Sequence, residues 1–324
     1  MHPAAPAPAA RVVAIDDGYA SYDQEEDLLA QAGARFELRP CGKDPAVAAE
    51  AVRGADVVLV RESPVPRGVI EAMDRCKAVI RYGIGVDNID TEAATGRRIA
   101  VANVPDYGID EVSTHAVAMV LALVRRLREH DAHVRGGQWS TGQSRPMYRL
   151  RGRTLGLVGF GRIARMTREM LSGFGLARTL VCDPQAQLPP DVEAADIDRI
   201  CREADVISLH APLTPQTRHL IDARRLQLMR PTAILVNTAR GGLVDLDALC
   251  DALREGRLLG AGLDVFEQEP PDPRHPVFSL DNLVVSHHIG WYSEESVRDL
   301  QRKAAQEAVR VLRGEPPLHW LNRW

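Results

Sequence analysis

The chain has 324 residues, of which 45% are hydrophobic and 26% charged, and its net charge is −4. This balance is typical of a soluble globular protein with two domains, and it gives no reason to expect a nucleic acid or an anionic membrane as a partner. Five scattered cysteines without a CxxC pair argue against a metal site or a disulfide framework and favour a reduced, cytoplasmic setting.

The first hundred residues predict alternating strands and helices. A Pro/Ala-rich start, residues 1–10, is expected to be disordered and lacks the apolar core of a signal peptide. A helix is expected over residues 23–32, because Gly33 directly after it is a typical helix stop. Short apolar strands are expected at residues 11–15, 57–60, 78–81 and 99–102. This rhythm predicts a parallel sheet with helices on both faces.

Residues 109–135 predict one long helix whose first half is apolar nearly all round, so it needs cover on more than one side. Its uncharged run, 112–124, is too short to cross a bilayer. Six strands follow, which is the number in a complete dinucleotide-binding domain. They are expected at residues 154–159, 179–183, 206–210, 233–237, 259–264 and 283–286. A last helix over residues 293–313, with Ser293 as its cap, could return to the first domain.

The most informative motif is Gly159-x-Gly161-x-x-Ala164 between the first of these strands and a helix. The glycines allow a tight turn and close approach of a pyrophosphate, which the helix N-terminus attracts. Asp183, 19 residues after Ala164, ends the next strand. A carboxylate there would accept hydrogen bonds from the ribose of NAD and repel the 2′-phosphate of NADP. The motif therefore favours NAD as the cofactor.

Three further groups of polar residues stand at expected strand ends, where α/β proteins bind ligands. Arg240 could hold a substrate carboxylate, or it could be a surface arginine after a turn. Glu267 and Glu269 follow the strand that ends at Asp264, and Glu267 is interpreted as a solvated loop acid. His288 follows His287 after the last strand, and one of these two could exchange a proton near neutral pH.

Arg240, Glu269 and His288, in this order behind the fingerprint, resemble the D-isomer-specific 2-hydroxyacid dehydrogenase family. The segments 82–90, 104–105, 209–217 and 237–245 share the resemblance, which covers most of the chain. It implies an α/β fold of two doubly wound parallel-sheet domains. A Rossmann NAD domain, residues 108–292, would be inserted into a flavodoxin-like substrate domain, residues 1–107 and 293–324. The family is usually dimeric, with the helix around residues 112–124 at the subunit contact.

The resemblance also implies roles for individual residues. Arg240 would hold the carboxylate and carbonyl of a 2-oxo acid, His288 would protonate the carbonyl oxygen, and Glu269 would keep His288 protonated. A second carboxylate anchor would consist of Arg81 and the N–H groups of Gly83, Ile84 and Gly85. The residues expected along the cofactor are Gly159, Gly161, Arg162, Ile163, Asp183, His210, Pro212, Thr217, Thr238 and Asp264.

Some positions depart from the common family pattern. His287 stands where proline is usual, and Thr114 stands where an acid is often found. The segments 213–219 and 288–294 especially resemble the branch that includes the C-terminal binding protein corepressors, which act as NAD(H)-responsive scaffolds. The three catalytic groups favour an enzyme with Trp291 in an apolar substrate pocket, but an NAD(H)-sensing scaffold and interface packing of Trp291 stay open.

The substrate is left open as well. Glyoxylate, hydroxypyruvate, pyruvate, phosphoglycerate and branched or thioether 2-oxo acids are all candidates. A phosphorylated substrate would need extra positive charge, which Arg61, Arg81 and Arg145 could provide.

Overall fold

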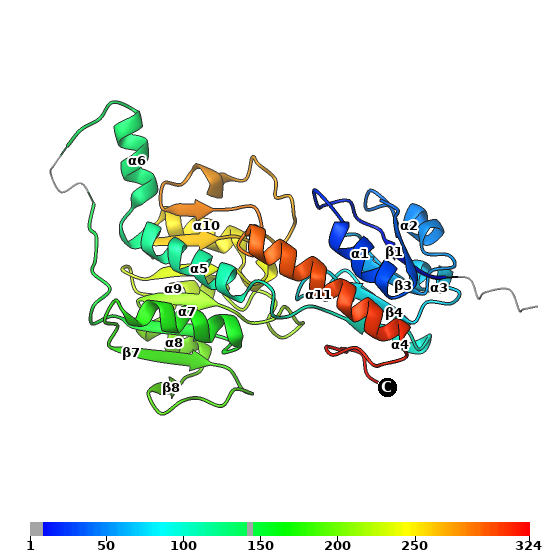
Figure 1. Cartoon of the computed structure of the whole chain (residues 1–324). Coiled ribbons are helices and arrows are strands. Elements are labelled where there is room, and N and C mark those ends of the chain that lie inside the picture. Colours follow the sequence, from blue (N-terminus) through cyan, green and yellow to red (C-terminus); the bar gives the residue numbers. More distant parts are fainter. Residues whose placement is uncertain (1–8, 141–144) are drawn as a thin grey trace, which may run out of the picture. The chain divides into compact units, whose positions relative to one another are not determined.

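The computed structural model describes residues 9–140 and 145–324, and it confirms the predicted α/β class with two fully parallel sheets (Figure 1). The chain divides into two compact units. Unit 1 comprises residues 1–108 and 293–324, and unit 2 comprises residues 109–292. Most of the segment expected to be disordered, residues 1–8, lies outside the described residues.

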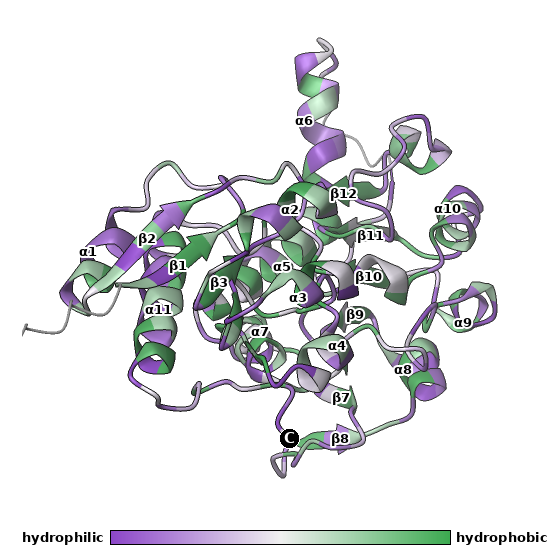
Figure 2. Cartoon of the chain, turned by 90° about the vertical axis from the view of Figure 1, so that its right-hand side faces the viewer, coloured by the Kyte–Doolittle hydropathy of each residue, from purple (hydrophilic) through white to green (hydrophobic). Residues whose placement is uncertain are grey.

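Unit 1 contains a five-stranded sheet with the order β2-β1-β3-β4-β5, which is the flavodoxin-like order. The strands are β1 (Ala10–Ala14), β2 (Ala34–Leu38), β3 (Val57–Val60), β4 (Ala78–Arg81) and β5 (Ala100–Ala102). The sequence did not predict the edge strand β2, since it carries Arg35 and Glu37 among its apolar residues. Figure 2 shows this contrast, with β3 green and β2 partly purple.

Helices cover both faces of this sheet. They are α1 (Asp23–Gln31), α2 (Pro45–Ala51), α3 (Arg67–Ala72), α4 (Thr91–Gly96) and α11 (Glu294–Leu312). One face packs with α2, α3 and α4 in a core of Val, Ile, Ala and Met side chains. The other face carries α1 and α11, which pack against each other. Ser293 caps α11 through a reciprocal bond with Ser296, which accounts for the predicted start of this helix.

Unit 2 contains a seven-stranded sheet with the order β12-β11-β10-β9-β6-β7-β8. Its strands are β6 (Thr154–Val158), β7 (Arg178–Cys182), β8 (Val192–Ala194), β9 (Val206–Leu209), β10 (Ile234–Asn237), β11 (Gly260–Leu263) and β12 (Leu283–Val285). The prediction of six strands was wrong, because β8 adds a short strand at one edge. Its three residues include one buried apolar side chain, Val192, so the local pattern carries no strand signal.

Both faces of this sheet are also covered. The helices are α5 (Ile109–Val124), α6 (Leu127–Arg135), α7 (Arg162–Ser172), α8 (Ile197–Glu203), α9 (Ala223–Leu228) and α10 (Leu246–Arg254). Two short 3₁₀ helices, η1 (Gly241–Leu243) and η2 (Pro276–Ser279), lie in connecting loops. Alternate strand residues face two separate cores, one shared with α5 and α7 and the other with α8, α9 and α10. This is the doubly wound arrangement that the sequence predicted.

The single long helix predicted over residues 109–135 is two helices. Arg126 adopts a left-handed backbone conformation with φ 49°, which ends α5 and starts α6 in a new direction (Figure 1). The guanidinium of Arg126 bonds Glu129 at 3.0 Å, and both side chains are largely buried. Within the described ranges, no helix is long and apolar enough to span a membrane.

An acidic side chain, Glu25, lies fully buried in unit 1. Burial raises the pKa of Glu25, and hydrogen bonds from Tyr82 and Gln301 offset only part of that increase. The folded state therefore favours the protonated acid, so its contribution to stability is complete below the ordinary pKa of 4.5 and is lost as the pH rises through the elevated value.

We expect Glu25→Gln to be more stable than the native chain at pH 7 and equally stable at pH 4. A gain of about 1 kcal/mol would raise Tm by about 2–4 °C in a domain of this size. Thermal unfolding followed by circular dichroism across this pH range measures the difference. A shift of the same size at every pH would contradict the explanation from ionisation.

Candidate active site

The fingerprint loop between β6 and α7 is shaped for close approach of a ligand. Gly159 has φ +85°, and a Cβ there would lie 2.8 Å from the carbonyl of His210. At Gly161, a Cβ would meet nothing within 4 Å, so the backbone faces open space. Helix α7 starts at Arg162 without a side-chain cap, which leaves the N–H groups of its first turn, including that of Ile163, available to an anion.

Asp183 directly follows β7 and lies against this loop. Its Oδ2 accepts the N–H of Phe160 at 2.8 Å, and its Oδ1 accepts those of Gln185 and Ala186. Burial raises the pKa of Asp183, but these three donors and Arg165 outweigh it and hold the pKa below its usual value. A negative charge is therefore maintained where the sequence predicted a contact with the cofactor ribose.

The remaining cofactor candidates differ in how their polar atoms are used. The hydroxyl of Thr238 is buried and has no partner among the described residues. Burial lowers the pKa of His210 to about 4, so its imidazole, which bonds Ser208 at 2.9 Å, is neutral. The hydroxyl of Thr217 donates to the carbonyl of Pro212 at 2.7 Å and braces its own loop. The open glycine loop and the unpartnered Thr238 hydroxyl fit a bound dinucleotide.

Glu269 and His288 form a direct pair. His288 Nδ1 and Glu269 Oε2 lie 2.7 Å apart, and Glu269 Oε1 accepts the N–H of Phe266 at 3.0 Å. Burial raises the pKa of Glu269, but His288, Phe266 and Arg240 lower it by more, so its net pKa is below the usual value. Trp291 lies beside the pair, since its Nε1 donates to the carbonyl of His288 at 3.0 Å.

Arg240 is presented by a tight turn after β10. The side chain of Asn237 closes this turn, donating to the carbonyl of Arg240 at 2.9 Å and accepting the N–H of Ala239 at 3.0 Å. The guanidinium of Arg240 donates to the carbonyl of Ala239 at 2.7 Å, and its charge acts on Glu269. Unit 2 thus brings a cation, a carboxylate and an imidazole together at the carboxyl ends of its strands.

Asp264 holds the loop that carries His288. Its carboxylate is 2% exposed and accepts the N–H groups of Ile289 and Gly290, each at 2.9 Å. Its backbone carbonyl accepts the N–H of His288 at 2.7 Å. His288 itself has φ 57°, a left-handed conformation that is uncommon for a residue other than glycine. These bonds maintain that strained conformation beside the reactive groups.

Two side chains that the sequence did not single out as site residues complete this support. Ser286 donates its hydroxyl to Asp264 Oδ1 at 2.6 Å, so its oxygen accepts from His115 Nε2 on α5 at 2.8 Å. Serine, histidine and aspartate therefore meet, but the serine lies between the other two. A histidine that activates a serine nucleophile must lie between serine and aspartate. The group is accordingly structural.

Glu267, interpreted from the sequence as a solvated loop acid, is exposed as expected and is also ion-paired. Its carboxylate contacts Arg218 and lies 2.8 Å from His219 Nε2, and the bond to His219 is the main cause of its lowered pKa. Gly241 packs against the same loop, where a Cβ would lie 1.8 Å from the carbonyl carbon of Phe266. The loops of Arg240 and Glu269 are thus held against each other.

The anchor predicted in unit 1 lies directly after β4. Gly83 has φ +135°, and a Cβ there would collide with the guanidinium of Arg81. The N–H of Gly83 is donated to the carbonyl of Arg81 at 3.0 Å, whereas those of Ile84 and Gly85 have no partner in the described part of the chain. Asn103 donates to the carbonyl of Ile84 at 2.6 Å, which fixes the loop. Two N–H groups of the predicted three are therefore available.

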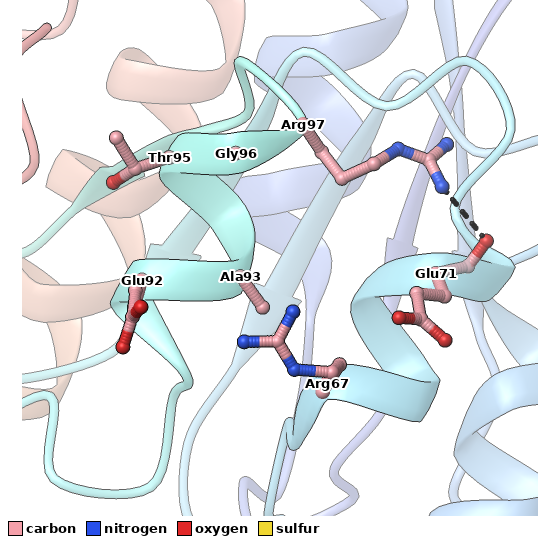
Figure 3. Close-up of a pocket in the computed structure, with 7 residues that line it drawn as sticks. All are labelled: Arg67, Glu71, Glu92, Ala93, Thr95, Gly96 and Arg97. Carbon is pink, nitrogen blue, oxygen red and sulfur yellow. Dashed lines mark hydrogen bonds between the residues drawn. The ribbon is translucent and has the colours of Figure 1, made fainter.

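A separate surface pocket of about 570 Å³ lies between α3 and α4 of unit 1 (Figure 3). It contains none of the predicted site residues. Of its two arginines, Arg67 and Arg97, the guanidinium of Arg97 donates to the carbonyls of Glu71 and Met73 at the end of α3. The pocket is a groove between two helices and is separate from the predicted site residues.

Known proteins resemble this chain over most of its length. Residues 117–290 match the family model described as D-isomer specific 2-hydroxyacid dehydrogenase, NAD binding domain. A glyoxylate reductase from Thermococcus litoralis is 40% identical over 299 residues, which cover 87% of this chain and 89% of the relative. A D-3-phosphoglycerate dehydrogenase from Methanocaldococcus jannaschii is 39% identical over 274 residues, or 82% of this chain, but this chain spans only 51% of that relative.

A solved structure of D-lactate dehydrogenase from Aquifex aeolicus, complexed with NAD and lactic acid, has the same fold. Its TM-score is 0.84 at 26% identity, and the match covers 94% of this chain and 96% of that one. The family match includes Arg240, Glu269 and the paired His288. The chain therefore belongs to the D-isomer specific 2-hydroxyacid dehydrogenase family, whose members are NAD-dependent oxidoreductases of 2-oxo and 2-hydroxy acids.

Proposed function

We propose that this chain reversibly reduces a 2-oxo acid to a D-2-hydroxy acid, with His288 as the proton donor and Arg240 as the group that holds the substrate. The observation that carries the proposal is the 2.7 Å bond between His288 Nδ1 and Glu269 Oε2, with the charge of Arg240 acting on the same carboxylate. Bound NADH would supply the hydride to the carbonyl carbon.

The Glu269 bond decides which nitrogen of His288 gives the proton. Because the pKa of Glu269 is lowered, its carboxylate accepts a hydrogen bond and Nδ1 carries the hydrogen. Nε2 is then the nitrogen that donates a proton to the carbonyl oxygen as negative charge develops there. In the reverse reaction the same nitrogen accepts the proton from the hydroxyl group.

Arg240 would bind the substrate carboxylate and polarise the carbonyl through the fork of its guanidinium. We assign the second carboxylate anchor to unit 1, with Arg81 and the N–H groups of Ile84 and Gly85, while the N–H of Gly83 shapes the loop. Unit 2 would hold the cofactor, and Trp291, bonded to the carbonyl of His288, would limit the side chain of the substrate.

Turnover of a panel of 2-oxo acids tests this proposal. NADH oxidation is measured with glyoxylate, hydroxypyruvate, pyruvate, phosphohydroxypyruvate and branched or thioether 2-oxo acids, and with the D- and L-2-hydroxy acids in reverse. Reduction of at least one acid to its D-isomer is expected. Tight NADH binding without turnover of any acid would instead support an NAD(H)-sensing scaffold.

We expect Asp183→Ala to weaken NADH binding and to improve NADPH binding, because the carboxylate repels a 2′-phosphate. The ratio of the two Kd values, measured by quenching of intrinsic fluorescence, should change by about tenfold or more, since one direct charge contact is worth about 1–3 kcal/mol. Asp191→Ala serves as a control that removes an exposed carboxylate from the following loop. An unchanged ratio in Asp183→Ala would assign cofactor choice to other residues.

We expect the chain to be a homodimer. Helix α6 and the residues after it carry three exposed apolar side chains, Leu127, Val134 and Trp139, and 82% of the surface of Trp139 is exposed. Exposed apolar side chains on α6 and in the segment just after it are suited to contact a second copy. Light scattering coupled to size-exclusion chromatography should give twice the mass of 35.6 kDa, and Val134→Glu should lower it. A monomeric native chain would contradict the expectation.

A further inference from the structure

A buried polar cluster joins helix α1, the end of β4 and helix α11 in unit 1. Tyr82 donates its hydroxyl to Glu25 Oε1 at 2.8 Å. Gln301 Nε2 lies 3.2 Å from both oxygens of Glu25 and donates to the carbonyl of Ser21 at 2.7 Å. Glu25, Tyr82 and Gln301 are each at most 5% exposed. Three elements distant in the sequence therefore meet through hydrogen bonds away from water.

Tyr82 connects this cluster to the anchor loop, defined here as residues 81–85. Its backbone N–H donates to the carbonyl of Val60 at 2.8 Å, and its ring packs edge-on against Tyr19 at 5.3 Å. Tyr82 is thus fixed at its backbone, its ring and its hydroxyl. The next residue is Gly83, which has φ 135°, and the N–H groups of Ile84 and Gly85 follow it directly in the chain.

Apolar side chains in place of this cluster would stabilise the fold more. Burying a carboxyl group has a free-energy cost that apolar side chains of the same volume avoid. The polar cluster does, however, impose one geometry, because each hydrogen bond requires its own distance and direction. Such a constraint is useful where backbone N–H groups must keep a fixed position toward a ligand.

We propose that Glu25 and Gln301 act through Tyr82 as positioning residues for the carboxylate anchor of the substrate. The inference rests on the proposed function, since it assumes that residues 81–85 bind the carboxylate of a 2-oxo acid. None of the three side chains contacts the substrate. They set the position of the N–H groups of Ile84 and Gly85, so their loss reduces substrate binding and leaves the proton-transfer groups of unit 2 unchanged.

The test compares Tyr82→Phe with Tyr22→Phe in the full-length chain. Tyr22 is a matched control, because its ring also packs against that of Tyr19, with 5.6 Å between the ring centroids. Tyr22→Phe also removes one hydroxyl hydrogen bond, which is donated to the carbonyl of Asp16 at 2.5 Å. We expect Tyr82→Phe to raise KM for the best 2-oxo acid by about fivefold or more with kcat within about twofold, as expected when ground-state binding is lost. KM for NADH should be unchanged, and Tyr22→Phe should leave all constants near the native values.

A second pair of variants probes the acceptor. Glu25→Gln keeps Oε1 as the shared acceptor and should retain a KM close to the native value, whereas Glu25→Met should raise it as Tyr82→Phe does. If Tyr82→Phe does not fold, Gln301→Met replaces it, since it removes the other donor to Glu25.

An unchanged KM in Tyr82→Phe, or equal effects in Tyr82→Phe and Tyr22→Phe, would overturn the proposal. A lower Tm without a change in KM would also overturn the proposal, because it would show a role in stability alone. Failure of the native chain to turn over any 2-oxo acid is a separate result, which would contradict the proposed function.

Discussion

Replacement of His288 with alanine should lower kcat for 2-oxo acid reduction by about 10²–10⁴-fold, the contribution typical of general acid catalysis. His288 Nδ1 is bonded to Glu269, and its Nε2 is the proposed proton donor. Hydride transfer without a proton donor leaves negative charge on the carbonyl oxygen, which raises the barrier. Stopped-flow measurement of NADH oxidation gives the rate, and fluorescence titration should show an NADH Kd within about twofold of the native value.

His287 provides a matched control for this variant. It is the neighbouring histidine, it is exposed, and it follows the same strand. His287→Ala should retain native kcat, because no part of the proposed mechanism uses it. Near-native turnover in His288→Ala, or an equal loss in both variants, would refute the assignment of the proton donor.

Replacement of Arg240 with alanine should lower kcat/KM by about 10²–10³-fold, as for removal of a donor that stabilises developing negative charge. Both kcat and KM should change. The guanidinium would bind the carboxylate in the ground state, which affects KM, and would polarise the carbonyl in the transition state, which affects kcat. Steady-state kinetics with the preferred 2-oxo acid measure kcat and KM separately. The NADH Kd should again stay near its native value.

Arg240→Lys separates charge from geometry. Lysine keeps the positive charge but lacks the planar fork that forms two parallel hydrogen bonds with a carboxylate. Compared with Arg240→Ala, we therefore expect Arg240→Lys to reverse part of the change in KM and little of the loss in kcat. Full recovery by lysine would indicate that charge alone is required and would contradict the proposed two-point contact.

The sequence was sufficient where one local pattern determined one structure. The glycines of the fingerprint specify a strand, a turn and a helix, and Asp183 follows at the expected distance, so the cofactor end of unit 2 could be predicted from spacing. The histidine and glutamate that pair at 2.7 Å could be selected through their resemblance to a family, although 19 residues separate them.

Other features depend on contacts that no local pattern contains. Arg126 is a good helix former, and its left-handed conformation could not be read from the residues around it. The sequence placed Asp264 along the cofactor but gave no sign of the bonds from its carboxylate to the loop of His288, which the structure shows. Glu25 and Gln301 are 276 residues apart in the chain, and only the packing of α1 against α11 brings them together.

The left-handed backbone of His288 has a consequence for the range of residues that this position can accept. Asparagine, aspartate and histidine enter that region more readily than other side chains, glycine enters it freely, and β-branched residues are strongly disfavoured. A library of all amino acids at position 288 would therefore separate into two sets. Selection for high stability would enrich the set that tolerates the backbone, and selection for turnover would retain histidine from within it.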